Sequence, residues 1–223
     1  MKDFIVSASI LGVKALNLDT ELEKIRKAGI GWVHFDVMDG KFVKNVSFED
    51  ELMGTACEKV KIIKDVHIMI EDPLSHVEEY VKYGADYLTF HYEACKDDSE
   101  VKQVIDKIHS YKMKAGLSIK PNTPVEVIYP FLKYLDLVLI MSVEPGYGGQ
   151  KFQDSALLKI AVLQAFIAAS RYRTLISVDG GINDKTAPYC LKSGANVLVV
   201  GQYLFGKDDY QERYKKIKEC LTL

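Results

Sequence analysis

Short apolar segments alternate along this chain with longer segments whose apolar residues recur at helical spacing. Several short segments are almost continuously apolar, such as Leu-Val-Leu-Ile-Met at 137–141, which is typical of strands buried on both faces of a parallel sheet. They predict eight strands, at residues 4–10, 32–38, 66–70, 87–90, 115–119, 137–141, 175–178 and 197–200. The segments between them predict helices at residues 20–27, 73–82, 101–111, 125–134, 155–169, 184–192 and 208–221, with a weaker helical pattern at 48–60.

A glycine just before a predicted strand recurs at regular intervals. Gly29, Gly84 and Gly194 each end a predicted helix, where glycine adopts the left-handed conformation that stops it. They are separated by 55 and 110 residues, which are multiples of about 27.5, and eight such units fill nearly the whole chain. We therefore expect one domain, residues 1–223, folded as a (β/α)8 TIM barrel. A doubly wound open sheet is the alternative, because it has the same βαβ order.

Composition and charge narrow the class of protein. Of 223 residues, 48% are hydrophobic, which allows one full core. No stretch approaches about 18 uncharged apolar residues, so we expect no membrane span. The net charge of −2 and the lack of a dense basic cluster argue against nucleic-acid binding. The N-terminus lacks the features of a secretory signal and the four cysteines form no C-x-x-C pair, so we expect reduced thiols in a cytoplasmic protein.

Polar residues interrupt three of the predicted strands. Alternation places His34 and Asp36 on one face of the second strand, His67 lies on the third, and Asp179 ends the seventh. In a barrel of this kind the active site forms at the carboxyl ends of the strands, so these four side chains can converge there. Two imidazoles and two carboxylates suit a divalent cation such as zinc, iron(II), cobalt or manganese. The pattern predicts a metal or acid–base site.

Glycines follow each of the last three predicted strands. They are Gly146, Gly148 and Gly149 after the sixth strand, Gly180 and Gly181 after the seventh, and Gly201 after the eighth. Backbone N–H groups of these loops are the usual phosphate cradle of the barrel fold. A cation, two carboxylates and a phosphate cradle suit proton transfer next to the carbonyl of a sugar phosphate.

Six motifs along the chain carry a resemblance to a known family. They are S-I-L at 9–11, V-H-F-D-V-M-D-G at 33–40, V-H-I-M at 66–69, T-F-H at 89–91, M-S-V-E-P-G-Y-G-G-Q at 141–150 and V-D-G-G at 178–181. In their order and spacing, over nearly the whole chain, the sequence resembles the ribulose-phosphate 3-epimerase family. The resemblance implies a barrel of the ribulose-phosphate-binding type, and His91 is expected to have a supporting or structural role.

The resemblance also implies a role for each candidate residue. His34, Asp36, His67 and Asp179 resemble the ligands of one divalent metal ion, with zinc the leading candidate over iron(II), cobalt or manganese. Asp36 and Asp179 resemble the catalytic acid–base pair. The implied substrate-binding residues are Ser9, His67, Met38, Met69, Met141, Gly146, Gly148, Gly149, Gly180, Gly181, Gly201 and Gln202. The three methionines resemble an apolar wall, and the glycines with Gln202 lie where the family holds the phosphate.

The implied function is the epimerisation of D-ribulose 5-phosphate and D-xylulose 5-phosphate at C3, through an enediolate, in the pentose phosphate pathway. A homo-oligomer, either a dimer or a hexamer, is also implied. A 3-epimerase of a six-carbon ketose phosphate such as D-allulose 6-phosphate is an alternative, because Gln202 stands where the family usually has serine. A non-catalytic sugar-phosphate-binding barrel is a second alternative, but it predicts loss of an acid–base residue, and Asp36 and Asp179 are both present.

Overall fold

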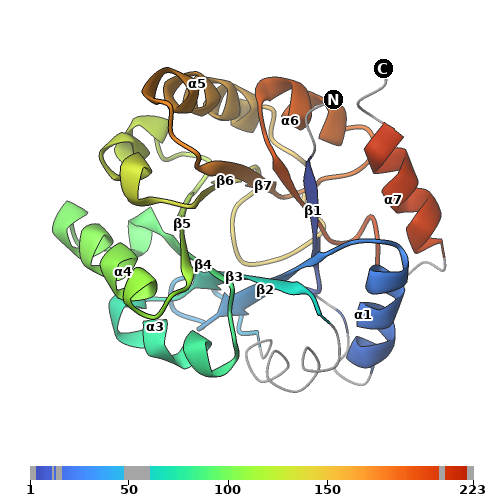
Figure 1. Ribbon diagram of the computed structural model, residues 1–223, viewed down its shortest axis with the longest axis horizontal. Helices are drawn as coiled ribbons and strands as arrows, with labels where there is room; N and C mark the ends of the chain where they lie inside the picture. The colour runs from blue at the N-terminus through green and yellow to red at the C-terminus, as the bar shows by residue number, and fades with distance from the viewer. Residues whose placement is uncertain (1–3, 12, 14–16, 48–60, 206–208, 220–223) are drawn as a thin grey trace.

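Eight parallel strands close into a barrel in sequence order, with helices around its outside (Figure 1). The computed structural model describes residues 4–11, 13, 17–47, 61–205 and 209–219. The strands are β1 (Ile5–Ser9), β2 (Trp32–Met38), β3 (Ile63–Met69), β4 (Tyr87–His91), β5 (Lys114–Ile119), β6 (Leu137–Met141), β7 (Leu175–Asp179) and β8 (Val197–Val200). Because β1 pairs with β8, the sheet has no edge, which confirms the (β/α)8 barrel and rules out the open sheet.

The helices follow the strands as the sequence pattern predicts. They are α1 (Leu18–Lys27), α3 (Pro73–Lys82), α4 (Asp98–Ser110), α5 (Ser155–Ser170), α6 (Ala187–Ser193) and α7 (Tyr210–Glu219), with short 3₁₀ helices η3 (Tyr92–Ala94) and η4 (Val125–Tyr134). The predicted helix at 48–60 lies outside the described residues. Gly29, Gly84 and Gly194 all have positive φ angles, as helix-ending glycines should. Among the described helices, none has the length and apolarity needed to cross a membrane.

Two predicted α-helices differ in the structure. The segment 125–134 forms the 3₁₀ helix η4 and contains Pro130. In an α-helix the ring of this proline would clash with the backbone carbonyl four residues earlier, which disfavours the predicted α-helix. The helix predicted to begin at residue 184 begins at Ala187. Before it, the side-chain oxygen of Asn183 accepts the N–H groups of Lys185 and Thr186 and holds the chain in a turn.

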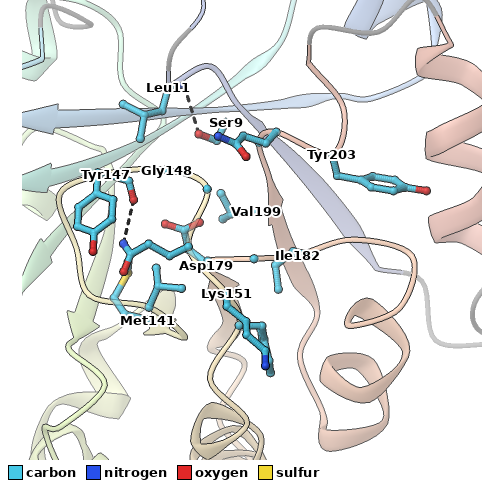
Figure 2. Close-up of a pocket in the computed structure, with 18 of the residues that line it drawn as sticks. Ser9, Leu11, Met141, Tyr147, Gly148, Lys151, Asp179, Ile182, Val199 and Tyr203 are labelled. Carbon is cyan, nitrogen blue, oxygen red and sulfur yellow. Dashed lines mark hydrogen bonds between the residues drawn. The ribbon is translucent and has the colours of Figure 1, made fainter.

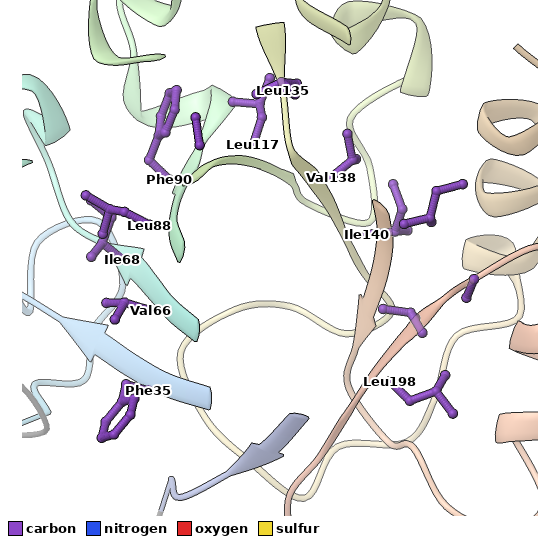
Figure 3. Close-up of a cluster of buried hydrophobic side chains, with 14 of the residues drawn as sticks. Phe35, Val66, Ile68, Leu88, Phe90, Leu117, Leu135, Val138, Ile140 and Leu198 are labelled. Atoms are coloured by element: carbon purple, nitrogen blue, oxygen red, sulfur yellow. The ribbon is translucent and has the colours of Figure 1, made fainter. Parts of the chain in front are cut away.

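The main hydrophobic core lies between the barrel and its helices. Alternation along β2 turns Val33, Phe35 and Val37 toward this layer, where all three are buried. Figure 3 shows Phe35, Val66 and other apolar side chains of the strands outside the ring of strands. This layer fixes the strands, so residues at their inner faces and carboxyl ends keep fixed positions.

The inside of the barrel is divided into an apolar part and a polar part. The apolar part comes mainly from β6 and β8, as Leu137, Leu139, Met141, Val197 and Val199. The buried polar side chains of β1 to β5 are Ser7, Ser9, His34, Asp36, Asp65, His67, Thr89, His91 and Ser118. Burying so many polar groups is costly unless they have partners, so this part of the barrel is where chemistry is expected.

A lysine of α5 ties down the loop that follows β5. Lys159 Nζ donates to the backbone oxygens of Lys120, Pro121 and Thr123, at 3.1, 2.6 and 2.6 Å. Replacing it by methionine keeps the stem and removes these bonds, so we expect Lys159→Met to lower the free energy of unfolding by about 2 kcal/mol. Urea unfolding measures this, with Lys192→Met at an exposed position of α6 as the matched control. An equal loss of unfolding free energy in Lys159→Met and Lys192→Met would contradict a stabilising role for the three Lys159 hydrogen bonds.

Candidate active site

A cavity of about 620 Å³ opens at the carboxyl ends of the strands. Figure 2 shows the Asp179 carboxylate near its middle, with Ser9 to one side and Met141 to the other. The predicted site residues that line it are Ser9, Asp36, Met38, Met69, Met141, Gly146, Gly148, Gly149, Asp179, Gly180, Gly181, Gly201 and Gln202. His34 and His67 do not line this cavity; both are buried in the barrel and reach it through contacts with Asp36.

Four predicted residues from three strands come together in the structure. His34, Asp36, His67 and Asp179 each offer one ligand atom, and these atoms all lie within 4.8 Å of one another. His34 and Asp36 come from β2, His67 from β3 and Asp179 from the end of β7. His67 Nδ1 lies 3.2 Å and His34 Nε2 lies 3.4 Å from the same oxygen of Asp36. We call these four residues the His/Asp cluster.

Side chains of Ser7, Ser9 and Asp65 form hydrogen bonds that fix the orientation of the cluster residues. Asp65 accepts hydrogen bonds from Ser7 Oγ at 2.9 Å and from His34 Nδ1 at 2.8 Å. Ser9 Oγ donates to the second oxygen of Asp36 at 3.0 Å. Because His34 donates its Nδ1–H to Asp65, a neutral His34 ring has the lone pair of Nε2 on the side of Asp36.

The cluster fits a divalent cation. Imidazole and carboxylate ligands lie about 2.0–2.2 Å from zinc. The four ligand atoms of the cluster all lie within 4.8 Å of one another, so small side-chain shifts would bring them to one such ion. Among the described residues, the buried Nε2 of His34 makes no hydrogen bond of good geometry, although Asp36 Oδ1 lies 3.4 Å away. A buried nitrogen that makes no hydrogen bond costs free energy, and coordination of a cation by that nitrogen would remove this cost. The donor set and this nitrogen together support a metal-binding group.

The two aspartates have opposite electrostatic surroundings. Burial would raise the pKa of Asp36, but His34 and His67 outweigh it and hold this pKa well below its usual range. Burial, together with the charge of Asp36, raises the pKa of Asp179 to about 6. Two carboxyl groups whose pKa values are driven apart are suited to act as base and acid at neutral pH.

The three predicted methionines form apolar surface around the aspartates. Met38 and Met69 are opposite each other in the β2–β3 ladder and pack with Val43. Met141 is opposite Asp179 in the β6–β7 ladder and packs with Val143 and Val199. All three methionines are buried, so both walls beside the carboxylates are apolar.

The glycine loops approach one another closely at the other side of the cavity. Gly181 has a φ of +62°, and a Cβ there would lie 2.6 Å from the backbone nitrogen of Phe152. A Cβ at Gly149 would lie 2.7 Å from the amide nitrogen of Gln202. Gln150 donates to the backbone oxygens of Glu144 and Tyr147 and so closes the loop after β6. The loops after β6, β7 and β8 therefore form one surface.

Two carboxylates near the site are missing from the sequence-based prediction. Asp65 supports His34, and alternation places it on the face of His67, but the predicted third strand begins one residue later, at 66. Glu93 accepts a hydrogen bond from His91 at 3.2 Å and lies in η3, which the sequence pattern does not predict.

The sequence-based prediction also did not include two lysines, Lys151 and Lys185, which line the cavity.

Comparison with sequence relatives gives a consistent family. The model of the ribulose-phosphate 3 epimerase family matches residues 5–205. The ribulose-phosphate 3-epimerase of Bacillus subtilis is 38% identical over 214 residues, which cover 96% of this chain and 97% of that protein. The chloroplastic ribulose-5-phosphate-3-epimerase of Arabidopsis thaliana is 38% identical over 218 residues, which cover 97% of this chain and 76% of that protein.

Solved structures of more distant proteins share the fold. The 3-keto-L-gulonate-6-phosphate decarboxylase of Vibrio cholerae aligns with a TM-score of 0.74 at 12% identity, over 100% of this chain and 98% of that one. A 3-hexulose-6-phosphate synthase aligns with a TM-score of 0.66 at 16% identity, over 97% and 99%. At such identities the likeness shows the barrel alone. Family membership follows from the sequence relatives: this chain belongs to the ribulose-phosphate 3-epimerase family of carbohydrate isomerases.

Proposed function

We propose that this protein interconverts D-ribulose 5-phosphate and D-xylulose 5-phosphate by moving the proton at C3. The observation that carries the proposal is the pair of carboxylates of Asp36, which is buried, and Asp179, which is half-buried; they share one cavity but have pKa values displaced in opposite directions. Family membership supports the choice of substrate, since the curated relatives are named for it. The pathway and the enediolate intermediate are part of the same proposal.

The His/Asp cluster would hold one divalent cation, with zinc the leading candidate. When bound, the cation supplies positive charge that stabilises the oxygens of the enediolate, which a carboxylate base alone cannot do. His34, Asp36, His67 and Asp179 are its ligands in this proposal, supported by their spacing and by the buried nitrogen of His34 that makes no hydrogen bond of good geometry to a described residue. Two imidazoles with two carboxylates favour zinc, iron(II), cobalt or manganese over magnesium or calcium.

Asp36 and Asp179 divide the proton transfer between them. The low pKa of Asp36 keeps it ionised, so Asp36 takes the C3 proton. The raised pKa of Asp179 allows it to carry a proton, which it returns to C3 from the other side. β2 and β7 are separated by β8 and β1 around the barrel, so the two carboxylates approach the cavity from different directions. Inversion at a planar carbon needs such a pair.

The remaining lining residues bind and isolate the substrate. The loops after β6, β7 and β8 offer backbone N–H groups to the phosphate, and Lys151 and Lys185 add positive charge at the same cavity. Met38, Met69 and Met141 surround the reacting carbon and limit its access to water. Excluding water strengthens the electrostatic interactions of the two aspartates with the substrate.

Substrate length tests this proposal. The purified protein is given D-ribulose 5-phosphate or D-allulose 6-phosphate, and NMR follows formation of the C3 epimer. We expect kcat/KM to be at least about tenfold higher for the pentose phosphate. Turnover of the hexose phosphate alone would mean that the substrate is the six-carbon sugar. Gln202 would then be the residue to examine, because it lines the cavity where the family usually has serine. No epimer from either sugar would contradict the proposed function.

Gln202 gives a prediction about the phosphate. Its amide lies against Gly149, so it can donate a hydrogen bond beside the loop after β6. We expect Gln202→Ala to raise KM for the pentose phosphate about 5- to 10-fold, the effect of one lost hydrogen bond, with kcat within about twofold. Steady-state kinetics measures this, with Gln211→Ala on α7 as the control. A fall in kcat at unchanged KM would contradict the assignment of Gln202 to the phosphate.

A further inference from the structure

His67 lies at the end of a hydrogen-bonded series that begins outside the His/Asp cluster. Its Nδ1 faces the cluster, 3.2 Å from Asp36 Oδ1, and its Nε2 lies 2.9 Å from His91 Nε2. On the far side of that ring, His91 Nδ1 lies 3.2 Å from Glu93 Oε2. Both imidazole rings are completely buried. Each ring N–H must therefore find its partner within this series.

Glu93 sets the direction of these hydrogen bonds. Burial would raise the pKa of Glu93, but hydrogen bonds from His91, Thr123 and the backbone N–H of Lys120 lower it to about 2. An ionised carboxylate can only accept, so His91 donates from Nδ1. A neutral His91 ring then accepts at Nε2, and His67 is the donor there. With a cation in the cluster, the proton of His67 is therefore on Nε2, and its Nδ1 presents a lone pair to the ion in place of a hydrogen bond to Asp36.

Glu93 is itself fixed in one orientation. Its other oxygen, Oε1, accepts from the backbone N–H of Lys120 at 2.7 Å and from the hydroxyl of Thr123. Lys159 binds the backbone oxygens of Lys120 and Thr123. The ring of Phe42 lies 4.9 Å from the ring of His91, measured between centroids, and limits its rotation. Oε2 of Glu93 is thus held toward His91.

We propose that Glu93 is a positioning residue that acts through His91 to fix the tautomer of His67 whose Nδ1 can bind the cation. This inference rests on the proposed cation site and adds one side chain to it. Metal-binding histidines commonly donate their second N–H directly to a carboxylate or carbonyl, which orients the ring. In this barrel His91 lies between His67 and Glu93, so the Glu93 carboxylate orients His67 through the His91 ring.

Glu93→Gln tests the inference because it keeps the size of the side chain and reverses one hydrogen bond. Lys120 N–H and the Thr123 hydroxyl are both donors, so the amide oxygen takes the place of Oε1. The amide NH2 then faces His91 and donates to its Nδ1. His91 now donates from Nε2, so His67 accepts there and carries its proton on Nδ1. That proton occupies the position of the cation.

Zinc binding measures the effect without any turnover. Full-length protein stripped of metal by a chelator is titrated with Zn²⁺ against a chromophoric competitor. We expect Glu93→Gln to raise the zinc dissociation constant about 10- to 100-fold. Glu126→Gln makes the same charge change at an exposed position of η4, and we expect it to stay within about threefold. Circular dichroism and urea unfolding of each variant separate lost affinity from lost fold.

The tautomers provide a second readout that needs no variant. In zinc-loaded, 15N-labelled wild-type protein, NMR should find the ring proton of His91 on Nδ1 and that of His67 on Nε2. Equal zinc affinity of the wild type and Glu93→Gln, or a His91 proton on Nε2, would overturn the role of Glu93 and leave the cation site standing. No zinc binding by the wild type would overturn the cation site and this inference together.

Discussion

Asp179→Asn should lower kcat for C3 epimerisation by about 10³- to 10⁴-fold, at the upper end of what a general acid or base contributes. Asparagine has nearly the same shape but cannot carry a proton to C3. The carboxylate also belongs to the His/Asp cluster, so its loss weakens that group as well. Asp179 ends β7, and its side chain accepts no hydrogen bond from the residues that the structure describes, so we expect the barrel to remain folded. Steady-state kinetics and circular dichroism measure the two effects.

Isotope exchange distinguishes the two roles in the same variant. Because Asp36 is intact, the Asp179→Asn variant should still exchange the C3 proton of one epimer with deuterated solvent. It should form almost none of the other epimer. Asp36→Asn should lose that exchange. Asp106→Asn, at an exposed position of α4, serves as the control for the chemical change. Epimerisation at the wild-type rate by Asp36→Asn or Asp179→Asn would contradict the assignment of two bases.

Gly181→Ala is expected to have the largest effect among changes in the phosphate loops. A residue with a side chain at the φ of +62° costs about 1–2 kcal/mol. The added Cβ would also lie 2.6 Å from the backbone nitrogen of Phe152, which cannot rotate away as a side chain can. The loops after β6 and β7 must then separate, at a total cost of about 3 kcal/mol. KM for the sugar phosphate should rise about 100-fold.

Gly31→Ala is the matched control for this variant. Nothing lies within 4 Å of a Cβ at Gly31, and its φ is not in the left-handed range. We expect its KM and stability to stay close to those of the wild type. If Gly181→Ala behaved like Gly31→Ala in kinetics and in urea unfolding, the close approach of the two loops would not matter for substrate binding.

The strands and the His/Asp cluster could be predicted from the sequence because both depend on simple periodicity. Continuous apolar segments predict β6 and β8 with their observed bounds, and a segment in which apolar residues alternate with His34 and Asp36 does the same for β2. Alternation within β2 placed His34 and Asp36 on one face, and the rule that parallel strands end at the same side of the barrel brought Asp179 to them. For these residues the local sequence pattern and the order of the strands in the barrel predict the same position.

The supporting carboxylates could not be predicted in the same way. Asp65 belongs to the polar start of β3, where an apolar pattern gives no signal, and its partners Ser7 and His34 are 58 and 31 residues away. Glu93 lies in a single 3₁₀ turn and is bound by a loop after the next strand. Such contacts depend on how strands pair in three dimensions. The helical pattern at 125–134 likewise did not reveal that this segment, which contains Pro130, forms a 3₁₀ helix.

Deuterium incorporation at C3 reports whether the protein moves this proton and whether the movement needs a cation. The protein is incubated with D-ribulose 5-phosphate in deuterated water, before chelation, after chelation and after addition of Zn²⁺, and NMR measures both C3 deuterium and D-xylulose 5-phosphate. We expect the epimer to form with deuterium at C3, both signals to stop on chelation, and both to return with zinc. An epimer that forms without deuterium, or at an unchanged rate in protein shown to be free of metal, would contradict cation-dependent proton transfer by Asp36 and Asp179.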